Sequence, residues 1–144
     1  MNKNVLILDD EPYSMSWLEE FVQNLGFNAL MCTNFKDAIE LIEKHKVFAA
    51  SIIDMNIPID VNSHGLVESK GEAYKQFHGL YIAHALRDSG NDKNSVIIFT
   101  VHDNPEISRI ADTLSVKYII KGHVRKIKEA VKRQLEYISN SGSK

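Results

Sequence analysis

Five short apolar runs alternate along the chain with longer stretches whose apolar residues recur at helical spacing. The runs cover residues 5–8, 27–32, 48–53, 95–99 and 116–120. Runs this short, and rich in Val, Ile and Phe, are typical of buried strands in a parallel sheet. The pattern therefore predicts five strands, each followed by a helix.

The intervening stretches carry helix start and stop signals. Pro12 suits the first turn of the first helix, and Gly26 follows its last apolar residue. Asn34 and Asn104 are suited to cap the second and fourth helices, and residues 80–87 form the third. The apolar stripe of the last helix is Val124, Ile127, Val131, Leu135 and Ile138. Strands alternating with helices require right-handed crossovers, so we expect an α/β fold, a (βα)5 sandwich around a parallel sheet.

Two segments break this rhythm. Residues 59–78 are polar, contain two glycines and show no clear period, and they separate the third strand from the third helix. A connection of this length is uncommon in a compact domain and is usually functional or mobile. Residues 139–144 have the composition of a disordered end. We therefore expect one domain over residues 1–138, with an insertion at about 59–78 and a disordered tail at 139–144.

Composition and charge narrow the function classes. The chain has 144 residues, of which 44% are apolar and 25% charged, as in ordinary soluble domains. A net charge of -2 gives no electrostatic reason to expect binding to nucleic acid or to a membrane surface. Neither a signal peptide nor a membrane-spanning run is present, so we expect a cytoplasmic protein. The single cysteine, Cys32, excludes an intrachain disulfide and is expected to be a buried small hydrophobe.

Polar residues directly follow four of the apolar runs. Asp9 and Asp10 end the first strand, Asp54 the third, Thr100 the fourth and Lys121 the fifth. In a sheet of strand order 2-1-3-4-5 these four strands are neighbours, and ligands bind beyond their carboxyl ends. Each residue alone is unremarkable, since an acid can cap a helix or begin a loop. Their joint placement predicts three carboxylates, a hydroxyl and an ammonium at one edge.

The chemistry of this set follows from its charges. Three carboxylates in one pocket repel one another unless a cation lies among them. Oxygen ligands with room for water favour Mg²⁺, which binds one or two carboxylates together with phosphate oxygens. A carboxylate beside such an ion can attack a phosphoryl group and form an acyl phosphate. Thr100 and Lys121 would then hold the other phosphoryl oxygens.

The same residues lie in four motifs, LILDDEP, IIDMNIP, VIIFT and YIIK. As a set, these resemble the motifs of response-regulator receiver domains, the CheY-like switches of two-component signalling. The resemblance covers residues 4–138 apart from the insertion, and it implies a flavodoxin-like three-layer sandwich. It also implies that Asp9 and Asp10 bind Mg²⁺, that Asp54 is the phosphoacceptor beside the ion, and that Asn56 offers its backbone carbonyl to the metal.

The resemblance implies a switch as well as a site. Thr100 and Tyr118 are similar to the family's switch pair, in which the hydroxyl moves toward the phosphate and the aromatic ring turns inward behind it. Lys121 is similar to the lysine that contacts the phosphoryl group. The implied donor is a phosphohistidine on a sensor histidine kinase or phosphotransfer protein. The implied output is a changed face over the fourth helix, fifth strand and fifth helix, which binds a downstream protein or a second copy of the chain.

Three features depart from the family pattern. Gly122 replaces the proline that normally follows the lysine after a cis peptide, and a cis bond before a non-proline residue costs about 2.5–4 kcal/mol. Val101 occupies a position that is usually small, which would restrict access to the pocket. The insertion is absent from ordinary members and either covers the site or presents a partner surface. Its His64 and His78 are expected to be solvated loop residues rather than metal ligands.

Other functions fit the sequence less well. A phosphatase of the haloacid dehalogenase type needs a second aspartate two residues after the nucleophile, where this chain has Asn56. We therefore expect no enzyme, only phosphotransfer to the chain's own aspartate and autodephosphorylation. A pseudo-receiver that binds partners without phosphorylation remains the alternative. The exposed cations of the last helix are expected either to be solvated or to dock an acidic partner; they are Arg125, Lys126, Lys128, Lys132 and Arg133.

Overall fold

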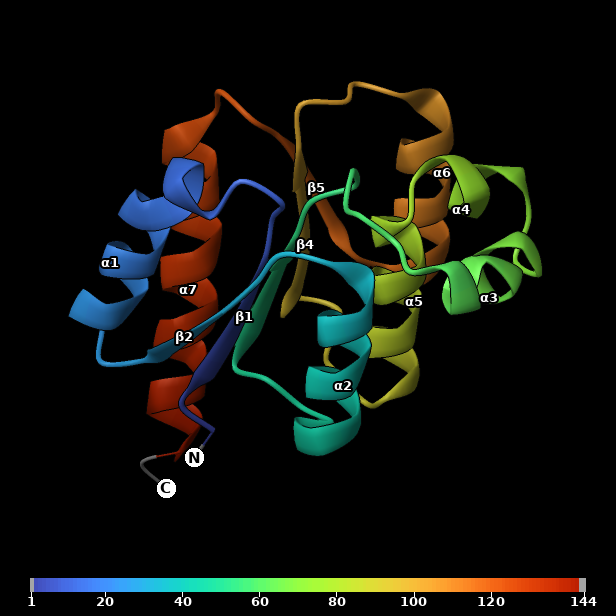
Figure 1. Cartoon of the computed structure of the whole chain (residues 1–144). Helices are drawn as coiled ribbons and strands as arrows, with labels where there is room; N and C mark the ends of the chain where they lie inside the picture. The colour runs from blue at the N-terminus through green and yellow to red at the C-terminus, as the bar shows by residue number, and fades with distance from the viewer. Residues whose placement is uncertain (1, 143–144) are drawn as a thin grey trace.

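The computed structural model describes residues 2–142, and its central element is a five-stranded sheet (Figure 1). The strands are β1 (Asn4–Leu8), β2 (Asn28–Cys32), β3 (Ala50–Ile53), β4 (Val96–Thr100) and β5 (Lys117–Ile120). All four pairings are parallel, and the strand order is β2-β1-β3-β4-β5. The predicted flavodoxin-like sheet with order 2-1-3-4-5 is confirmed.

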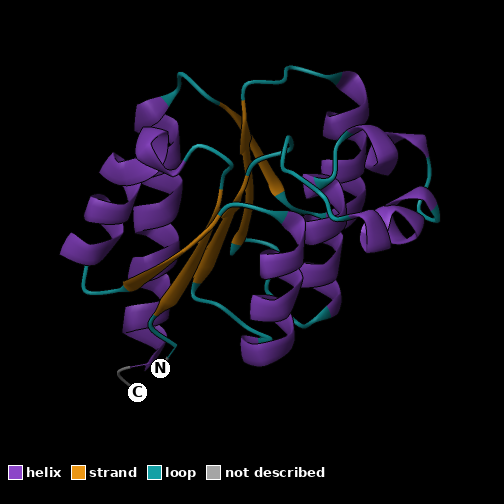
Figure 2. Cartoon of the chain, viewed as in Figure 1, coloured by secondary structure: helices purple, strands orange, loops and turns teal. Residues whose placement is uncertain are grey.

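Helices cover both faces of the sheet and make the three layers visible in Figure 2. One face carries α1 (Ser16–Asn24), which follows the 3-10 turn η1 (Pro12–Met15), together with α7 (Val124–Gly142). The other face carries α2 (Phe35–His45), α5 (Gly79–Asp88) and α6 (Pro105–Leu114). Alternate residues of each strand point to opposite faces. Val5 and Ile7 accordingly join the buried cluster under α1 and α7, and Leu6 and Leu8 join the buried cluster under α2, α5 and α6.

The predicted helix caps are present in the structure. Asn34 precedes α2, and its side chain accepts a hydrogen bond of 2.9 Å from the backbone N–H of Asp37. Asn104 precedes α6 and accepts from the N–H groups of Glu106 and Ile107. Such a cap satisfies backbone donors that the first helical turn leaves unpaired. Both caps therefore fix where the loops after β2 and β4 end.

The insertion folds into three short elements, which are η2 (Val61–Ser63), α3 (His64–Glu68) and α4 (Glu72–Gln76). They lie outside α5 and α6, as the green segments of Figure 1 show. Val67 and Phe77 anchor the insertion, because both are buried in the cluster beneath α2, α5 and α6. The polar sequence of the insertion did not predict α3 and α4, since five residues are too few to display a helical period.

The chain's last helix is longer than predicted. α7 continues to Gly142, whereas the sequence composition predicted a disordered tail from residue 139. The polar residues after Ile138 thus extend the helix over 139–142, and residues 143 and 144 lie outside the described range. Within residues 2–142, no helix combines the length and the apolar character that crossing a membrane requires.

Candidate phosphoacceptor site

The strand ladders bring the predicted residues to one edge of the sheet. Asp54 donates its backbone N–H to the carbonyl of Leu8, at 2.9 Å, which places it beside Asp9. On the other side, Lys121 donates its N–H to the carbonyl of Thr100, at 2.7 Å. Because these bonds continue the β1–β3 and β4–β5 ladders, the positions of the backbones follow from the sheet register.

Three carboxylates meet at this edge. One oxygen each of Asp9, Asp10 and Asp54 lies within 4.8 Å of the others, and no other group of three or more ligating side chains occurs among the described residues. Asp9 and Asp54 are 2% and 7% exposed, whereas Asp10 is exposed. Carboxylate oxygens with solvent access on one side are the donor set that Mg²⁺ uses in proteins. The cluster fits a hard divalent cation.

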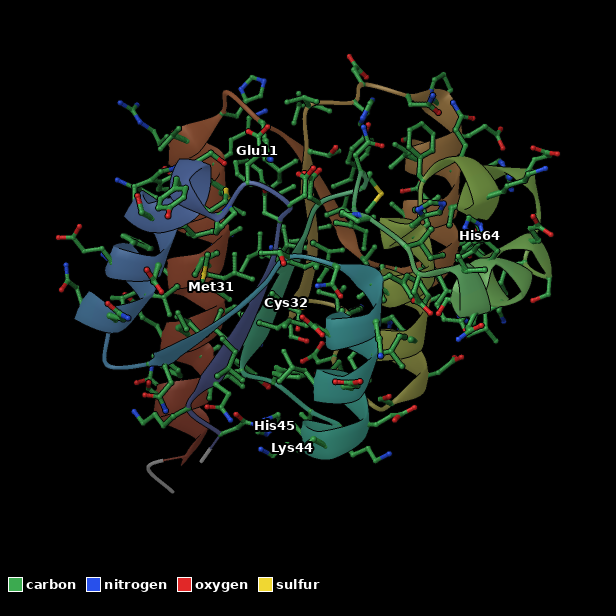
Figure 3. The ribbon with its side chains drawn as sticks, in the orientation of Figure 1. Glu11, Met31, Cys32, Lys44, His45 and His64 are labelled. Carbon is green, nitrogen blue, oxygen red and sulfur yellow. The ribbon has the colours of Figure 1, made fainter. Side chains whose placement is uncertain are left out.

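Each buried carboxylate also has fixed partners. Oδ1 of Asp9 accepts from the backbone N–H of Glu11 at 2.8 Å, and Oδ1 of Asp54 accepts from that of Met55 at 2.7 Å. Their Oδ2 atoms face Lys121, whose Nζ is 2.6 Å from Asp9 and 3.2 Å from Asp54. The ammonium thus bridges two carboxylates from different strands. Figure 3 shows Glu11 at this end of the molecule.

The charges in the cluster are strongly coupled. Burial raises the pKa of the Asp54 carboxyl, the Lys121 ammonium opposes that rise, and the charge of Asp9 adds to it. Burial alone would lower the pKa of Lys121, but its hydrogen bond to Asp9 and the charge of Asp54 outweigh burial and raise that pKa. Removing carboxylates from water disfavours their ionised form, and a nearby cation restores it. Lys121 therefore favours the ionised form of Asp54, against the effect of burial.

Thr100 and Tyr118, the predicted switch pair, lie at the end of β4 and within β5. Thr100 is buried, and its hydroxyl oxygen is 3.4 Å from the backbone N–H of His102. Tyr118 is half-buried, and its hydroxyl accepts from the backbone N–H of Asn104 at 3.0 Å and donates to the carbonyl of His102. Its ring packs against the core cluster beneath α5 and α6, so it is turned inward.

The remaining predicted site residue is Asn56. It lies two residues after Asp54 at the same edge, with an exposed side chain. Its contribution to the site is expected to come from its backbone carbonyl, and that role stays a prediction.

The departures from the family pattern have structural counterparts. The peptide bond between Lys121 and Gly122 is trans, as are the other bonds of the described chain. Gly122 has a φ of +105°, a conformation that glycine adopts readily and other residues do not. Val101 is 66% exposed, and its effect on access to the pocket stays a prediction.

The insertion ends directly against Asp54. A Cβ on Gly79 would lie 2.0 Å from the carbonyl oxygen of Asp54, so only glycine fits at this start of α5. Next to it, Nδ1 of His78 is 3.1 Å from the carbonyl of Ile57, and the ring of His64 stands edge-on to His78. Figure 3 labels His64 on α3. Neither histidine belongs to the metal-ligating group found among the described residues.

Sequence reasoning missed the roles of three residues near the site. Gly79 follows the insertion directly, and a glycine opening an apolar helix is a signal for close backbone approach. His102, in the loop between β4 and α6, contacts Phe77 at the end of the insertion, with ring centroids 5.2 Å apart. No sequence spacing links these two residues, so only the fold reveals their contact.

The fold is shared with solved structures. No family model and no curated protein matches the sequence. A two-component response regulator from Clostridium difficile superposes with a TM-score of 0.69 at 16% identity, over 95% of this chain and 98% of the other. TrrA, a response regulator from Thermotoga maritima in complex with Mg²⁺-BeF, superposes with a TM-score of 0.66 at 22% identity, over 92% of this chain and 99% of the other. The chain has the fold of a receiver domain.

Another receiver domain, from the sensor histidine kinase PA1611 of Pseudomonas aeruginosa, gives a TM-score of 0.64 at 14% identity, over 94% of this chain and 99% of the other. That structure has a magnesium ion coordinated in its active-site cleft. The resemblance read from the four sequence motifs is thereby confirmed at the level of the fold. In this chain the segment predicted to be an insertion, residues 59–78, lies beside α5 and α6.

Proposed function

We propose that this receiver domain is a phosphorylation-dependent signalling switch whose acceptor is Asp54. The observation that carries the proposal is the convergence of Asp9, Asp10, Asp54 and Lys121 at the carboxyl edge of a receiver fold. The proposed donor is the phosphohistidine of a sensor histidine kinase or a phosphotransfer protein. Asp9, Asp10 and Asp54, with the carbonyl of Asn56, would hold Mg²⁺, which supplies positive charge to the phosphoryl oxygens when bound.

The residues of the chain have distinct parts in the proposed transfer. A carboxylate oxygen of Asp54 forms the new bond to phosphorus as the bond from phosphorus to the donor nitrogen breaks. The ammonium of Lys121, 3.2 Å from Oδ2 of Asp54, is within reach of a phosphoryl oxygen there. Thr100 offers its hydroxyl to a second oxygen as it moves toward the phosphate. Transfer of this kind depends mainly on positioning and on neutralising charge.

The proposed output is a change in the face formed by α6, β5 and α7. Phosphorylation would alter which protein binds this face, either a downstream target or a second copy of the chain. We expect no binding to nucleic acid or membranes, no turnover of an external substrate, and a cytoplasmic location. Two of the α7 cations already have partners, since Lys128 lies over the rings of Trp17 and Phe21, and Lys132 is 3.8 Å from Glu136. An acidic partner would compete with these contacts.

The second candidate is a pseudo-receiver that binds proteins without phosphorylation. The trans loop at Gly122 favours it, because this loop carries Lys121 and departs from the family pattern.

Intact mass after incubation with Mg²⁺ and acetyl phosphate separates the two candidates. We expect one phosphoryl adduct on the wild type, its loss with EDTA, and no adduct on Asp54→Asn. Asp103→Asn is the matched control, since Asp103 is an exposed acid of the β4–α6 loop outside the cluster. Its adduct should equal that of the wild type. The absence of any adduct on the wild type would favour the pseudo-receiver.

A further inference from the structure

The insertion touches the switch loop through one aromatic pair. Phe77 directly follows α4 and is 4% exposed, so it is fixed within the core. Its ring centroid lies 5.2 Å from that of His102, at an interplanar angle of 58°. His102 belongs to the loop between β4 and α6, which begins immediately after Thr100. The last residues of the insertion and the first residues of this loop therefore lie side by side.

The His102 ring packs on Phe77 without a hydrogen bond from its buried nitrogen to any described residue. Nε2 of His102 is buried and has no hydrogen-bond partner among the described residues. A ring whose buried nitrogen is unpaired gains its stability from contacts with other rings and apolar groups. The backbone of His102 is bound on both sides, since its N–H faces the Thr100 hydroxyl and its carbonyl accepts from the Tyr118 hydroxyl.

The chain of contacts continues to α6. The Tyr118 hydroxyl, which donates to the carbonyl of His102, also accepts a hydrogen bond of 3.0 Å from the backbone N–H of Asn104. Asn104 caps α6 through its own side chain. A displacement of His102 would therefore disturb Tyr118 and the start of α6 together. These are the parts of the molecule that the proposed switch moves.

We propose that Phe77 is a positioning residue for the switch: through His102, the insertion holds Tyr118 turned inward and favours the conformation that phosphorylation of Asp54 selects. A contact made in one of two conformations shifts the population toward it. Because such coupling is reciprocal, a receiver that already populates this conformation accepts the phosphoryl group more readily. The phosphorylation part of this inference rests on the proposed function.

The first test needs no phosphorylation. In Phe77→Leu an apolar side chain stays in the core, but the ring contact with His102 is lost. An aromatic pair of this kind is worth a factor of about two to ten in an equilibrium constant. We expect the amide proton of Asn104, measured by NMR, to exchange faster by that factor. Tyr81→Leu is the matched control, because the Tyr81 ring packs on Phe35 of α2. It should leave Asn104 unchanged.

The second test measures the rate of phosphorylation by acetyl phosphate at saturating Mg²⁺. We expect Phe77→Leu and His102→Leu each to slow it by about two- to tenfold, and the double variant to be no slower than the worse single one. Urea unfolding of each variant corrects for general loss of stability. Independent, additive effects, or an Asn104 amide that exchanges as in the wild type, would overturn the inference. If the wild type takes no phosphoryl group, the proposed function fails, while the exchange test still decides whether Phe77 holds the loop.

Discussion

The sequence predicted which residue types lie at the strand ends, but not which atoms these residues contact. The sequence placed Asp9, Asp54 and Lys121 after strands, and this followed from the apolar runs alone. The ammonium bridge from Lys121 to both carboxylates depends on the length of the lysine chain and on the register of four strands, which the sequence pattern does not specify. The same limit applies to Tyr118. Its inward ring is fixed by hydrogen bonds to His102 and Asn104 that no motif encodes.

Gly122 offers a test of backbone conformation at one residue. Its φ of +105° favours glycine, and a Cβ there would meet no atom within 4 Å, so the strain is purely conformational. We expect Gly122→Ala to lower the free energy of unfolding by about 1 kcal/mol and to slow phosphorylation by displacing Lys121. Gly65→Ala is the control, because Gly65 lies within α3, has ordinary backbone geometry and equal space. Equal losses in urea unfolding for the two variants would contradict this account.

Cys32 offers a test of burial at one residue. Burial raises the pKa of its thiol from 9.0 to about 11. Since only the thiolate reacts, alkylation at pH 8 should be at least about a hundredfold slower in the native protein than in urea. The rate should rise as the pH approaches 11, provided that the protein stays folded. Iodoacetamide labelling followed by mass spectrometry measures both rates. A native rate equal to the rate in urea would show that Cys32 is not enclosed at the end of β2.

At the scale of elements, the sequence predicted what carries a local signal. Asn34 and Asn104 cap their helices as expected, because an N-cap is a contact within one turn. The insertion helices α3 and α4 carry no such signal, and each has only five residues. Their positions depend on Val67 and Phe77 entering a core built by distant elements. The extension of α7 beyond residue 138 was missed because polar composition alone does not end a helix.

The junction between the insertion and α5 gives a prediction at this scale. Gly79 begins α5 so close to Asp54 that a Cβ would lie 2.0 Å from its carbonyl oxygen. Backbone atoms cannot yield as flexible side chains do, so Gly79→Ala must push α5 away from the sheet. We expect a loss of about 2 kcal/mol or more in urea unfolding, together with weaker Mg²⁺ binding as Asp54 shifts. Gly65→Ala again serves as the control, and a Gly79→Ala variant as stable as this control would contradict the close approach.

At the scale of the whole molecule, the sheet and its two layers of helices were predictable, because many weak sequence signals agree on them. Five runs alternating with helices specify a parallel sheet covered on both faces, and the two buried clusters lie where that arrangement requires them. The convergence of the site then follows, since parallel strands end at one edge. The place of the insertion does not follow, because nothing in its polar sequence indicates whether it covers the acidic edge or the outside of α5 and α6.

Binding of Mg²⁺ should couple the site to the stability of the whole molecule. A cation that binds only the folded state stabilises it, by about 2.7 kcal/mol at a concentration one hundred times the Kd. Asp10 is the sharpest probe, because it is exposed, belongs to the acidic cluster and makes no hydrogen bond or ion pair with another described residue. In EDTA we expect Asp10→Asn to be at least as stable to urea as the wild type, because it removes one of three carboxylates that repel one another, yet to gain far less stability from Mg²⁺. Asp103→Asn, compared at equal ionic strength, should gain as much as the wild type. Equal gains in Asp10→Asn and Asp103→Asn would mean that the ion binds elsewhere, and the acidic edge would then lose its place in the proposed phosphotransfer.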